Sequence, residues 1–489
     1  MTSFKILRLA AIHYPHAKDQ LTSKLNERQG LSYSEMIDVV HDESVMHSNW
    51  FAKGMTALGH DACEILCDLD VLQMVWAKER GIPIDNDWRL NVLLDQIKVH
   101  QPDILYMQDI YNLPFSIRKE LKERFPSIKK VVLFKGYPGA YDELEGMDVI
   151  LSCAPRLVDL FKETGHSNVH LMYHGFDSSI QIPDPVEEPV DFLFAGSTGC
   201  GGLGADHKRR YSLLSGLMKH TPLEIWGDEA GRYMPWDLEK RPTTKVSRHF
   251  GKWVLGMLPA KTLEALLSKG ILPKFVADQC KQLIQEKRAV ALFPMLGWRG
   301  LEAMVKNGSI PDSLIYLAEV YLSEWRDLAV PGLQEWESED LVRMDTQVPL
   351  FPLRDFYPER FHNPVFGVEM YQLLRRAKLS FNIHIDTIQG QAGNMRMFEV
   401  TGAGSCLLTD AASNMSDLFE DGKEVVTYSS LEECVEKANY LLENEAERAE
   451  IATAGHKRTL KSHTLGHRCV EIEQHIQNSL NSSVSALAN

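Results

Sequence analysis

The sequence predicts an α/β protein with two halves, each built on a parallel sheet. Short apolar runs alternate with helical patterns over residues 1–180, and the same alternation begins again at Val190. A proline-rich segment, residues 182–189, lies between the two and has the composition of a linker. Strands separated by helices of this length are typical of βαβ units. At 489 residues the chain is also too long for a single ordinary core.

In the first half, the expected strands are short apolar runs: Lys5–Ile12, Ala62–Leu66, Ile104–Gln108, Lys130–Phe134, Val149–Ser152 and Val169–Tyr173. The expected helices lie between them at Ser44–Leu58, Leu90–His100, Ser116–Arg124 and Pro155–Thr164. We therefore expect residues 1–180 to form one Rossmann-like domain.

In the second half, the expected strands are Val190–Gly196, Leu223–Trp226, Leu379–Ile385 and Ser405–Thr409. The expected helices are His207–Lys219, Tyr371–Ala377, Arg396–Thr401 and Leu431–Glu443. Residues 230–355 break the alternation and predict a mostly helical insertion, and the Ser/Asn-rich end, residues 476–489, predicts a disordered tail. The second domain is expected over residues 190–475.

Composition narrows the class of partner and the compartment. The net charge of -15 argues against nucleic acid as the main partner, because binding phosphate backbones needs a basic surface. The eight cysteines have no zinc-ligand or C-x-x-C spacing, which favours reduced, buried thiols and a cytoplasmic protein. No apolar stretch reaches the roughly 18 residues of a membrane span.

A glycine-rich turn follows the strand that ends near Ala195. Gly199, Gly201 and Gly204 spell G-x-G-x-x-G, and Glu224 lies where a dinucleotide fold places its ribose-binding acid. Three further residues separate these glycines from the next helix, and Glu224 is followed by more strand-like sequence. The loop therefore allows three interpretations: a nicotinamide or flavin site, a ligand-free loop, or a loop facing the phosphates of another nucleotide.

A second constellation lies around Asn394. A buried-looking strand ends in His384 and Asp386, a glycine-bearing loop follows, and Asn394 can cap a short helix. The start of that helix offers amides and a positive dipole end to a diphosphate, and Arg396 can add a charged contact. Glu399, about one turn further, can accept hydrogen bonds from two ribose hydroxyls. Simpler roles remain open: a cap for Asn394, an ion pair for Arg396 and a helix-surface charge for Glu399.

Here the residues resemble a known family. The segments Phe366–Leu374, Lys378–His384, Asn394–Glu399, Leu407–Asp410 and Glu424–Tyr428 resemble the C-terminal half of CgeB-like glycosyltransferases, in the same order. These belong to the group-1 superfamily with the GT-B fold, in which two Rossmann-like domains face each other across a cleft. The resemblance implies an acceptor-side first domain and a second domain that binds a nucleoside-diphosphate sugar, with no tightly bound cofactor.

The resemblance also implies roles for individual residues. By this resemblance, Glu399 binds the ribose, and Arg209 or Arg210 neutralises the diphosphate. The full set expected around the nucleotide is Gly196, Ser197, Arg209, Arg210, Trp226, Gly227, Gly367, Asn394, Arg396 and Glu399. The set expected around the donor sugar is His384, Asp386, Gln391 and Gly393. Gln391 is a departure, because many members carry a glutamate there as the first residue of E-x7-E.

A catalytic base is needed only for inverting transfer. Asp109 and His13 are the candidates, since each follows a predicted strand of the first half. Each also has a simpler interpretation, a helix cap for Asp109 and a loop residue for His13. No D-x-D motif has a convincing setting, so no metal is expected, because helix amides and arginines can stabilise the leaving diphosphate.

The sequence leaves several choices open. It does not distinguish UDP, GDP and dTDP, nor a glycan, protein or small-molecule acceptor, nor the oligomeric state. Two alternatives remain beside a glycosyltransferase. One is an NAD(P)-dependent oxidoreductase that uses the Gly199–Gly204 loop, and the other is a catalytically silent relative that binds sugars or proteins.

Overall fold

The computed structural model describes residues 3–12, 14–28, 30–43, 49–108, 112–137, 144–184, 186–198, 210–227 and 353–488, with residues 262, 265 and 268. The chain divides into two compact units. The first comprises Met1–Phe194, Pro364–Tyr428 and Tyr440–Asn489, and the second comprises Ala195–Asn363 and Ser429–Asn439. The predicted insertion, residues 230–355, lies almost entirely outside the described residues.

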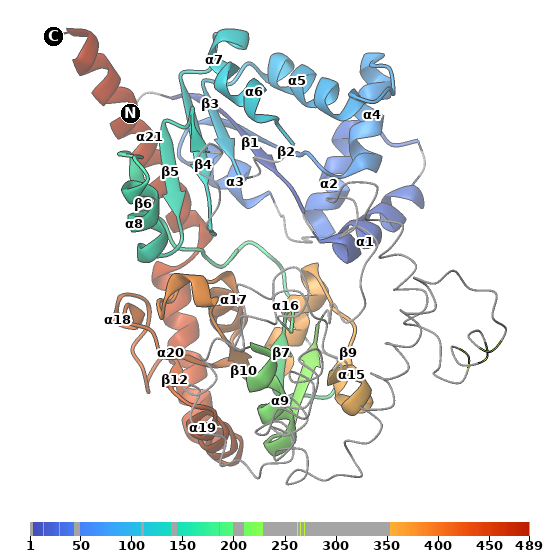
Figure 1. The fold of residues 1–489 in the computed structure, drawn as a ribbon, viewed down its shortest axis with the longest axis vertical. Coiled ribbons are helices and arrows are strands. Elements are labelled where there is room, and N and C mark those ends of the chain that lie inside the picture. Colours follow the sequence, from blue (N-terminus) through green and yellow to red (C-terminus); the bar gives the residue numbers. More distant parts are fainter. Residues whose placement is uncertain are drawn as a thin grey trace. The chain divides into compact units, whose positions relative to one another are not determined.

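The first unit contains a six-stranded parallel sheet (Figure 1). Its order is β2 (Asp61–Leu66), β1 (Lys5–Ala10), β3 (Ile104–Met107), β4 (Lys130–Phe134), β5 (Val149–Ser152) and β6 (Val169–Leu171). β3, β4 and β5 are buried at every position, as parallel strands covered on both faces are. Because the order reverses at β1 and β3, the carboxyl ends of these two neighbours mark the switch point of the sheet.

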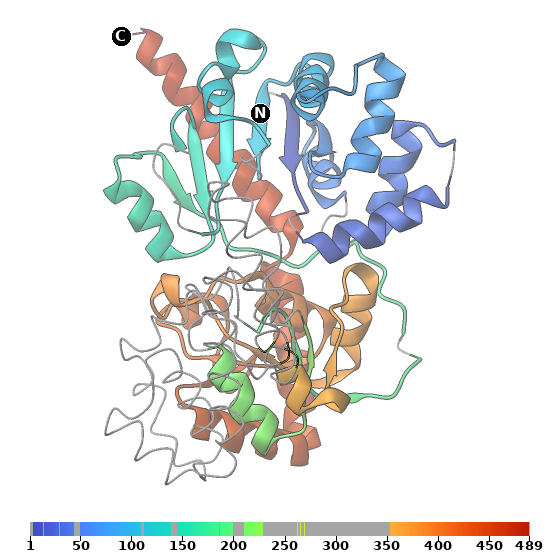
Figure 2. The same ribbon diagram turned by 45° about the vertical axis from the view of Figure 1, so that its right-hand side comes forward.

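Helices connect these strands: α1 (Pro15–Asn26), α2 (Tyr33–Glu43), α3 (Trp50–Ala57), α4 (Asp70–Arg80), α5 (Trp88–His100), α6 (Phe115–Lys119), α7 (Leu121–Arg124) and α8 (Pro155–Glu163). Pro15 and Pro155 start α1 and α8, where a missing N–H costs nothing. Figure 2 shows α1, α2 and α4 side by side, and their buried Leu21, Val40 and Leu72 share one apolar cluster.

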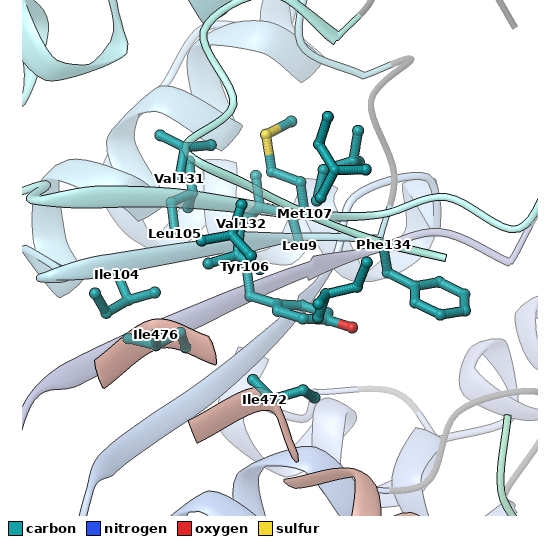
Figure 3. Packing of buried hydrophobic residues seen from close by; sticks show 14 of the residues in the cluster. Leu9, Ile104, Leu105, Tyr106, Met107, Val131, Val132, Phe134, Ile472 and Ile476 are labelled. Atoms are coloured by element: carbon teal, nitrogen blue, oxygen red, sulfur yellow. The ribbon is translucent and has the colours of Figure 1, made fainter. Parts of the chain in front are cut away.

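A helix from a distant part of the chain completes the hydrophobic core of the first sheet. Helix α21 (Leu465–Ala488) lies against α3 and contacts β4 and β5. Figure 3 shows Ile472 and Ile476 of α21 beneath Ile104 and Tyr106 of β3. All four side chains are almost completely buried. Helix α21 is therefore part of the hydrophobic core of the N-terminal sheet.

A second parallel arrangement in the first unit has the order β12 (Val426–Tyr428), β11 (Cys406–Asp410), β10 (Ala377–Asn382) and β7 (Val190–Ala195). Its helices are α16 (Gly367–Arg376), the 3-10 helix η7 (Asp386–Ile388), α17 (Met395–Ala403), α18 (Met415–Leu418) and α20 (Glu445–Ser462). The second unit contains α9 (Arg210–His220), β8 (Leu223–Trp226), α15 (Leu353–Phe356), the 3-10 helix η6 (Pro358–Arg360) and β9 (Phe361–His362). Helix α19 (Leu431–Glu443) crosses the boundary between the units.

These elements confirm the predicted fold class, an α/β protein with two Rossmann-like parallel sheets. The segment predicted as a disordered tail, residues 476–489, continues α21 as far as Ala488. Its polar composition concealed buried positions, since Ile476 and Ser479 are both enclosed. The domain boundaries near residues 180 and 190, and the cleft between the domains, stay predictions.

Candidate functional site

Helix α17 follows β10 through a loop and is buried from Met397 to Ala403. Glu399 is the fifth residue of this helix and is only 4% exposed. Its Oε2 lies 2.8 Å from Nη1 of Arg396, an ion pair that lacks the alignment of a hydrogen bond. The hydroxyl of Tyr371 donates to Oε1 at a long 3.4 Å. Glu399 is thus a buried carboxylate with acceptor capacity to spare.

Burial shapes the charge around this carboxylate. Tyr371 lies on α16, and its pKa is raised well above the ordinary value, chiefly by burial and then by the charge of Glu399. A neutral phenol is therefore available as a donor to the carboxylate at all ordinary pH values. Arg396 directs its charge at Glu399, the simpler role that the sequence left open, and it also contacts Sδ of Met370 at 2.9 Å.

Asn394 occupies the N-cap position of α17 with an extended backbone, φ -74° and ψ 155°. The expected side-chain cap is absent there, so that prediction is wrong. Nδ2 of Asn394 instead donates to Oδ1 of Asn382 at 2.7 Å and, more weakly, to the carbonyl of Ile383 at 3.4 Å. Stronger bonding to β10 has drawn the side chain away from the helix, whose first-turn amides Asn394 leaves uncapped.

His384 follows β10 and is buried, with both ring nitrogens engaged. Nδ1 lies 2.7 Å from Oδ1 of Asp410, at the end of β11, and Nε2 lies 3.0 Å from Sδ of Met397. The backbone N–H of His384 donates to the same carboxylate oxygen at 3.0 Å. The structure therefore gives His384 a complete set of protein contacts. Asp386, the other predicted polar residue, begins η7.

The remaining predicted donor-sugar residues contact the N-terminal half of the first unit. Oε1 of Gln391 accepts a hydrogen bond from the backbone N–H of Arg156, in the first turn of α8, at 2.6 Å. A Cβ on Gly393 would lie 2.1 Å from the carbonyl oxygen of Cys153, so only glycine fits. The loop before α17 is thereby held against the start of α8.

In the second unit, the structure brings together most of the predicted loop residues. Gly196 donates its N–H to the carbonyl of Trp226 at 3.0 Å, and a Cβ on Gly227 would lie 2.2 Å from the Gly196 oxygen. Arg210 begins α9 and donates to the carbonyl of Ser197 at 3.2 Å. The chain around Gly196 therefore has close backbone contacts that exclude larger side chains.

Trp226 and Glu224 meet a residue that the sequence did not single out. The Trp226 ring stacks on His362 with centroids 4.0 Å apart, and Nε2 of His362 lies 2.9 Å from Oε2 of Glu224. Glu224 is the second residue of β8 and not its tip, where a dinucleotide fold would need it. Gly367, also predicted near the nucleotide, begins α16 in the first unit with φ 63°.

Several predicted residues lie outside the described part of the chain: His13, Asp109, Arg209 and the Gly199–Gly204 loop. The strands that precede the two catalytic candidates are described, however. β1 leads to His13 and β3 leads to Asp109, and these strands are parallel neighbours with Leu9 opposite Met107. The two strands that precede these candidates therefore end at the switch point of the first sheet, the edge at which such sheets bind ligands.

The sequence analysis missed the roles of Asn382, Thr409 and Asp410. Their polar side chains lie at the carboxyl ends of β10 and β11, and this position was the available signal. Within the described residues, no group of three or more His, Cys, Asp or Glu is placed to hold a metal ion. No helix in the same part of the chain is long and apolar enough to cross a membrane.

Comparison with known proteins shows that part of this chain resembles a described family. Residues 322–474 match the family described as glycosyl transferase-like, and this segment contains α16, α17 and the loop between β10 and α17. The match confirms the predicted class of enzyme, a glycosyltransferase, and agrees with the group-1 superfamily. No curated protein matches the chain.

The solved structures that resemble this chain are remote. HepE from Anabaena, in complex with UDP and glucose, is 12% identical with a TM-score of 0.48, covering 98% of this chain and 100% of its own. Sucrose-phosphate synthase from Thermosynechococcus elongatus is 9% identical, with a TM-score of 0.46 and coverages of 98% and 99%. An alpha-glucosyltransferase in complex with UDP and DNA is 10% identical, with a TM-score of 0.48 and coverages of 97% and 100%. Because these structures are so distant, we infer the function of this chain from its own residues.

Proposed function

We propose that the protein transfers a sugar from a nucleoside-diphosphate sugar to an acceptor, and that the nucleotide is bound at the start of α17. The observation that carries this proposal is Glu399, a buried carboxylate whose Oε2 has no aligned hydrogen-bond donor among the described residues. Buried acceptors normally have donors, and vicinal ribose hydroxyls would supply two.

The residues before Glu399 suit the rest of the nucleotide. The first-turn amides of α17 are not capped by Asn394, and a helix N-terminus of this kind favours a diphosphate. Arg396, in the first turn, carries a positive charge that can contact the phosphates once ribose hydroxyls satisfy Glu399. We include the CgeB-like subgroup and the GT-B arrangement across a cleft in this proposal.

The acceptor half is proposed from the first sheet. Asp109 and His13 follow β3 and β1 at the switch point, where either could take the proton of an acceptor hydroxyl in an inverting reaction. We propose a cytoplasmic enzyme, because the eight cysteines have no C-x-x-C spacing and five of the six described ones are buried. The diphosphate would leave with the help of helix amides and arginine, without a metal ion.

A nucleotide panel tests the proposal. UDP, GDP or dTDP should raise the melting temperature, because a ligand at 100 times its Kd adds about 2.7 kcal/mol to the free energy of unfolding. A bound nucleotide sugar should then be hydrolysed slowly or transferred when acceptors are supplied. Stabilisation by NADH or NADPH alone would favour the oxidoreductase, and nucleotide binding without any turnover would favour the silent relative.

A further inference from the structure

Four side chains form a polar chain across the ends of β11 and β10: the buried Asp410, Thr409 and Asn382, and the half-buried Asn394. The hydroxyl of Thr409 donates to Oδ1 of Asp410 at 3.3 Å, and Nδ2 of Asn382 donates to that hydroxyl at 2.9 Å. Nδ2 of Asn394 then donates to Oδ1 of Asn382 at 2.7 Å. Thr409 and Asn382 are 0% and 2% exposed, so no water competes for these bonds.

The carboxylate at one end fixes the direction of every bond in the polar chain. An ionised carboxylate only accepts, and Asp410 also accepts the backbone N–H and Nδ1 of His384. Thr409 has one proton, which it gives to Asp410, so it must accept from the amide nitrogen of Asn382. The oxygen of Asn382 consequently faces Asn394, which must present its own nitrogen.

This direction bears on the start of α17. A helix cap needs the side-chain oxygen of the N-cap residue to accept an amide N–H of the first turn. Asn394 already has the extended backbone of an N-cap residue, but its side-chain nitrogen donates to Oδ1 of Asn382, which holds the side chain on β10. Among the described residues, Oδ1 of Asn394 has no hydrogen-bond partner.

We propose that Asn382 is a positioning residue for the donor: it holds the Asn394 side chain on β10 and so keeps the first-turn amides of α17 available to the diphosphate. The proposal rests on the proposed function. It assigns to Asn382 an effect on donor affinity that acts through Asn394 and not through contact with the ligand.

The experiment is a double-mutant cycle. Asn382→Leu, close in volume, releases Asn394, which then caps α17 and competes with the diphosphate. The Kd of the nucleoside diphosphate that binds best among UDP, GDP and dTDP should rise about fivefold, the factor that a typical N-cap corresponds to. Adding Asn394→Ala removes the competing cap, and the Kd should return towards that of the wild type. Calorimetric titration measures each Kd.

Thr401→Val is the matched control, because it removes a buried hydrogen bond, to Oγ1 of Thr459 at 2.6 Å, from the far end of the same helix. It should lower the melting temperature and leave the Kd unchanged. If Asn382→Leu does not fold, Asp410→Asn tests the same idea, because a neutral amide at this position no longer fixes the direction of the polar chain. The Kd of Asp410→Asn should also rise, and adding Asn394→Ala should return it towards that of the wild type.

The outcomes separate the two proposals. A wild-type protein that binds none of the three nucleotides would overturn the proposed function itself. If the wild type binds, an unchanged Kd in Asn382→Leu would overturn the positioning role alone. A raised Kd that Asn394→Ala does not restore would also overturn it, because the loss would then come from general disruption of the site.

Discussion

Oε1 of Gln391 accepts a hydrogen bond from the backbone N–H of Arg156, two residues that are 235 positions apart in the chain. The glutamine stands where many group-1 enzymes have a catalytic-region glutamate, and here it satisfies one of the amides at the start of α8. Its neighbour Gly393 packs on the carbonyl of Cys153. The glutamine that departs from the E-x7-E pattern therefore has a structural role here, because it joins the loop before α17 to the first turn of α8.

Gln391→Ala should lower the free energy of unfolding by about 1 kcal/mol, the usual cost of losing a helix cap. Gln391→Glu keeps an acceptor and adds a negative charge near the helix N-terminus, so its stability should equal or exceed that of the wild type. Chemical denaturation followed by tryptophan fluorescence measures both. Equal destabilisation by the two variants would contradict the cap.

Gly393→Ala should cost about 2 kcal/mol or more, because the new Cβ would overlap the backbone of Cys153 and the loop must shift. Gly422→Ala is the control, since Gly422 has φ 75° and no atom within 4 Å of its would-be Cβ. Its cost should be only the backbone strain of about 1–2 kcal/mol. Gly393→Ala should also reduce turnover, and the control should not; equal effects on turnover would rule out a special need for this contact.

Glu399→Ala should weaken nucleoside diphosphate binding at least about tenfold, or ~1.4 kcal/mol, because the ribose loses its acceptor. Glu399→Gln keeps one acceptor oxygen, so its affinity for the nucleotide should lie between those of the wild type and Glu399→Ala. The control is Glu433→Ala, which removes a helix-surface glutamate paired with Lys437 at 2.6 Å. Calorimetric titration of all three decides the matter, and unchanged affinity in Glu399→Ala would refute the ribose role.

His463 should make stability fall in mild acid. Nδ1 of His463 accepts a hydrogen bond from Arg468 at 3.1 Å, and Nε2 of His463 lies 2.9 Å from the carbonyl of Leu418. The neutral ring therefore uses both of its nitrogens. Burial, aided by Arg468, lowers the pKa of His463 to about 4. The unfolded chain, with an ordinary pKa near 6.5, therefore binds the proton first.

The contribution of His463 is complete above about pH 6.5 and is lost as the pH falls towards about 4, with a slope of about 1.4 kcal/mol per pH unit between these values. His463→Gln does not titrate and can keep both hydrogen bonds, so its stability should fall less steeply with acid. The free energy of unfolding is measured against pH for the wild type and the variant. If it falls equally steeply with acid in both, His463 does not have this role.

Asp109→Asn should abolish sugar transfer while leaving the Kd of the donor nucleotide unchanged, because the proposed base contacts the acceptor and not the nucleotide. His13→Gln is the parallel variant on the neighbouring strand end. Transfer assays measure turnover in each variant, and titrations with the donor nucleotide measure its Kd. Full turnover in both variants would point to a mechanism without a protein base, as in retaining transfer.

The strands were predictable because parallel strands buried on both faces read as continuous apolar runs. The bounds of β4, β5 and β8 agree with the sequence to the residue. Helices α1, α2 and α4 were not predicted. The first two bury only two or three side chains each.

The sequence could indicate contacts only between close neighbours in the chain, such as the ion pair of Arg396 and Glu399 within α17. The polar chain was not predictable, because it depends on the pairing that sets Asn382 opposite Thr409 on β10 and β11. The partner of Gln391 and the stacking of Trp226 on His362 depend likewise on distant segments meeting. A single sequence carries no direct record of such pairings.

Helix α21 gives the protein a constraint on the order in which it can mature. β1 and β3 leave the ribosome early, yet the apolar surface around Ile104 and Tyr106 is closed by Ile472 and Ile476, synthesised more than 350 residues later. Until those residues emerge, the nascent N-terminal sheet presents an uncovered apolar face. Its growing chain is therefore a natural client for chaperones that shield hydrophobic surface during translation.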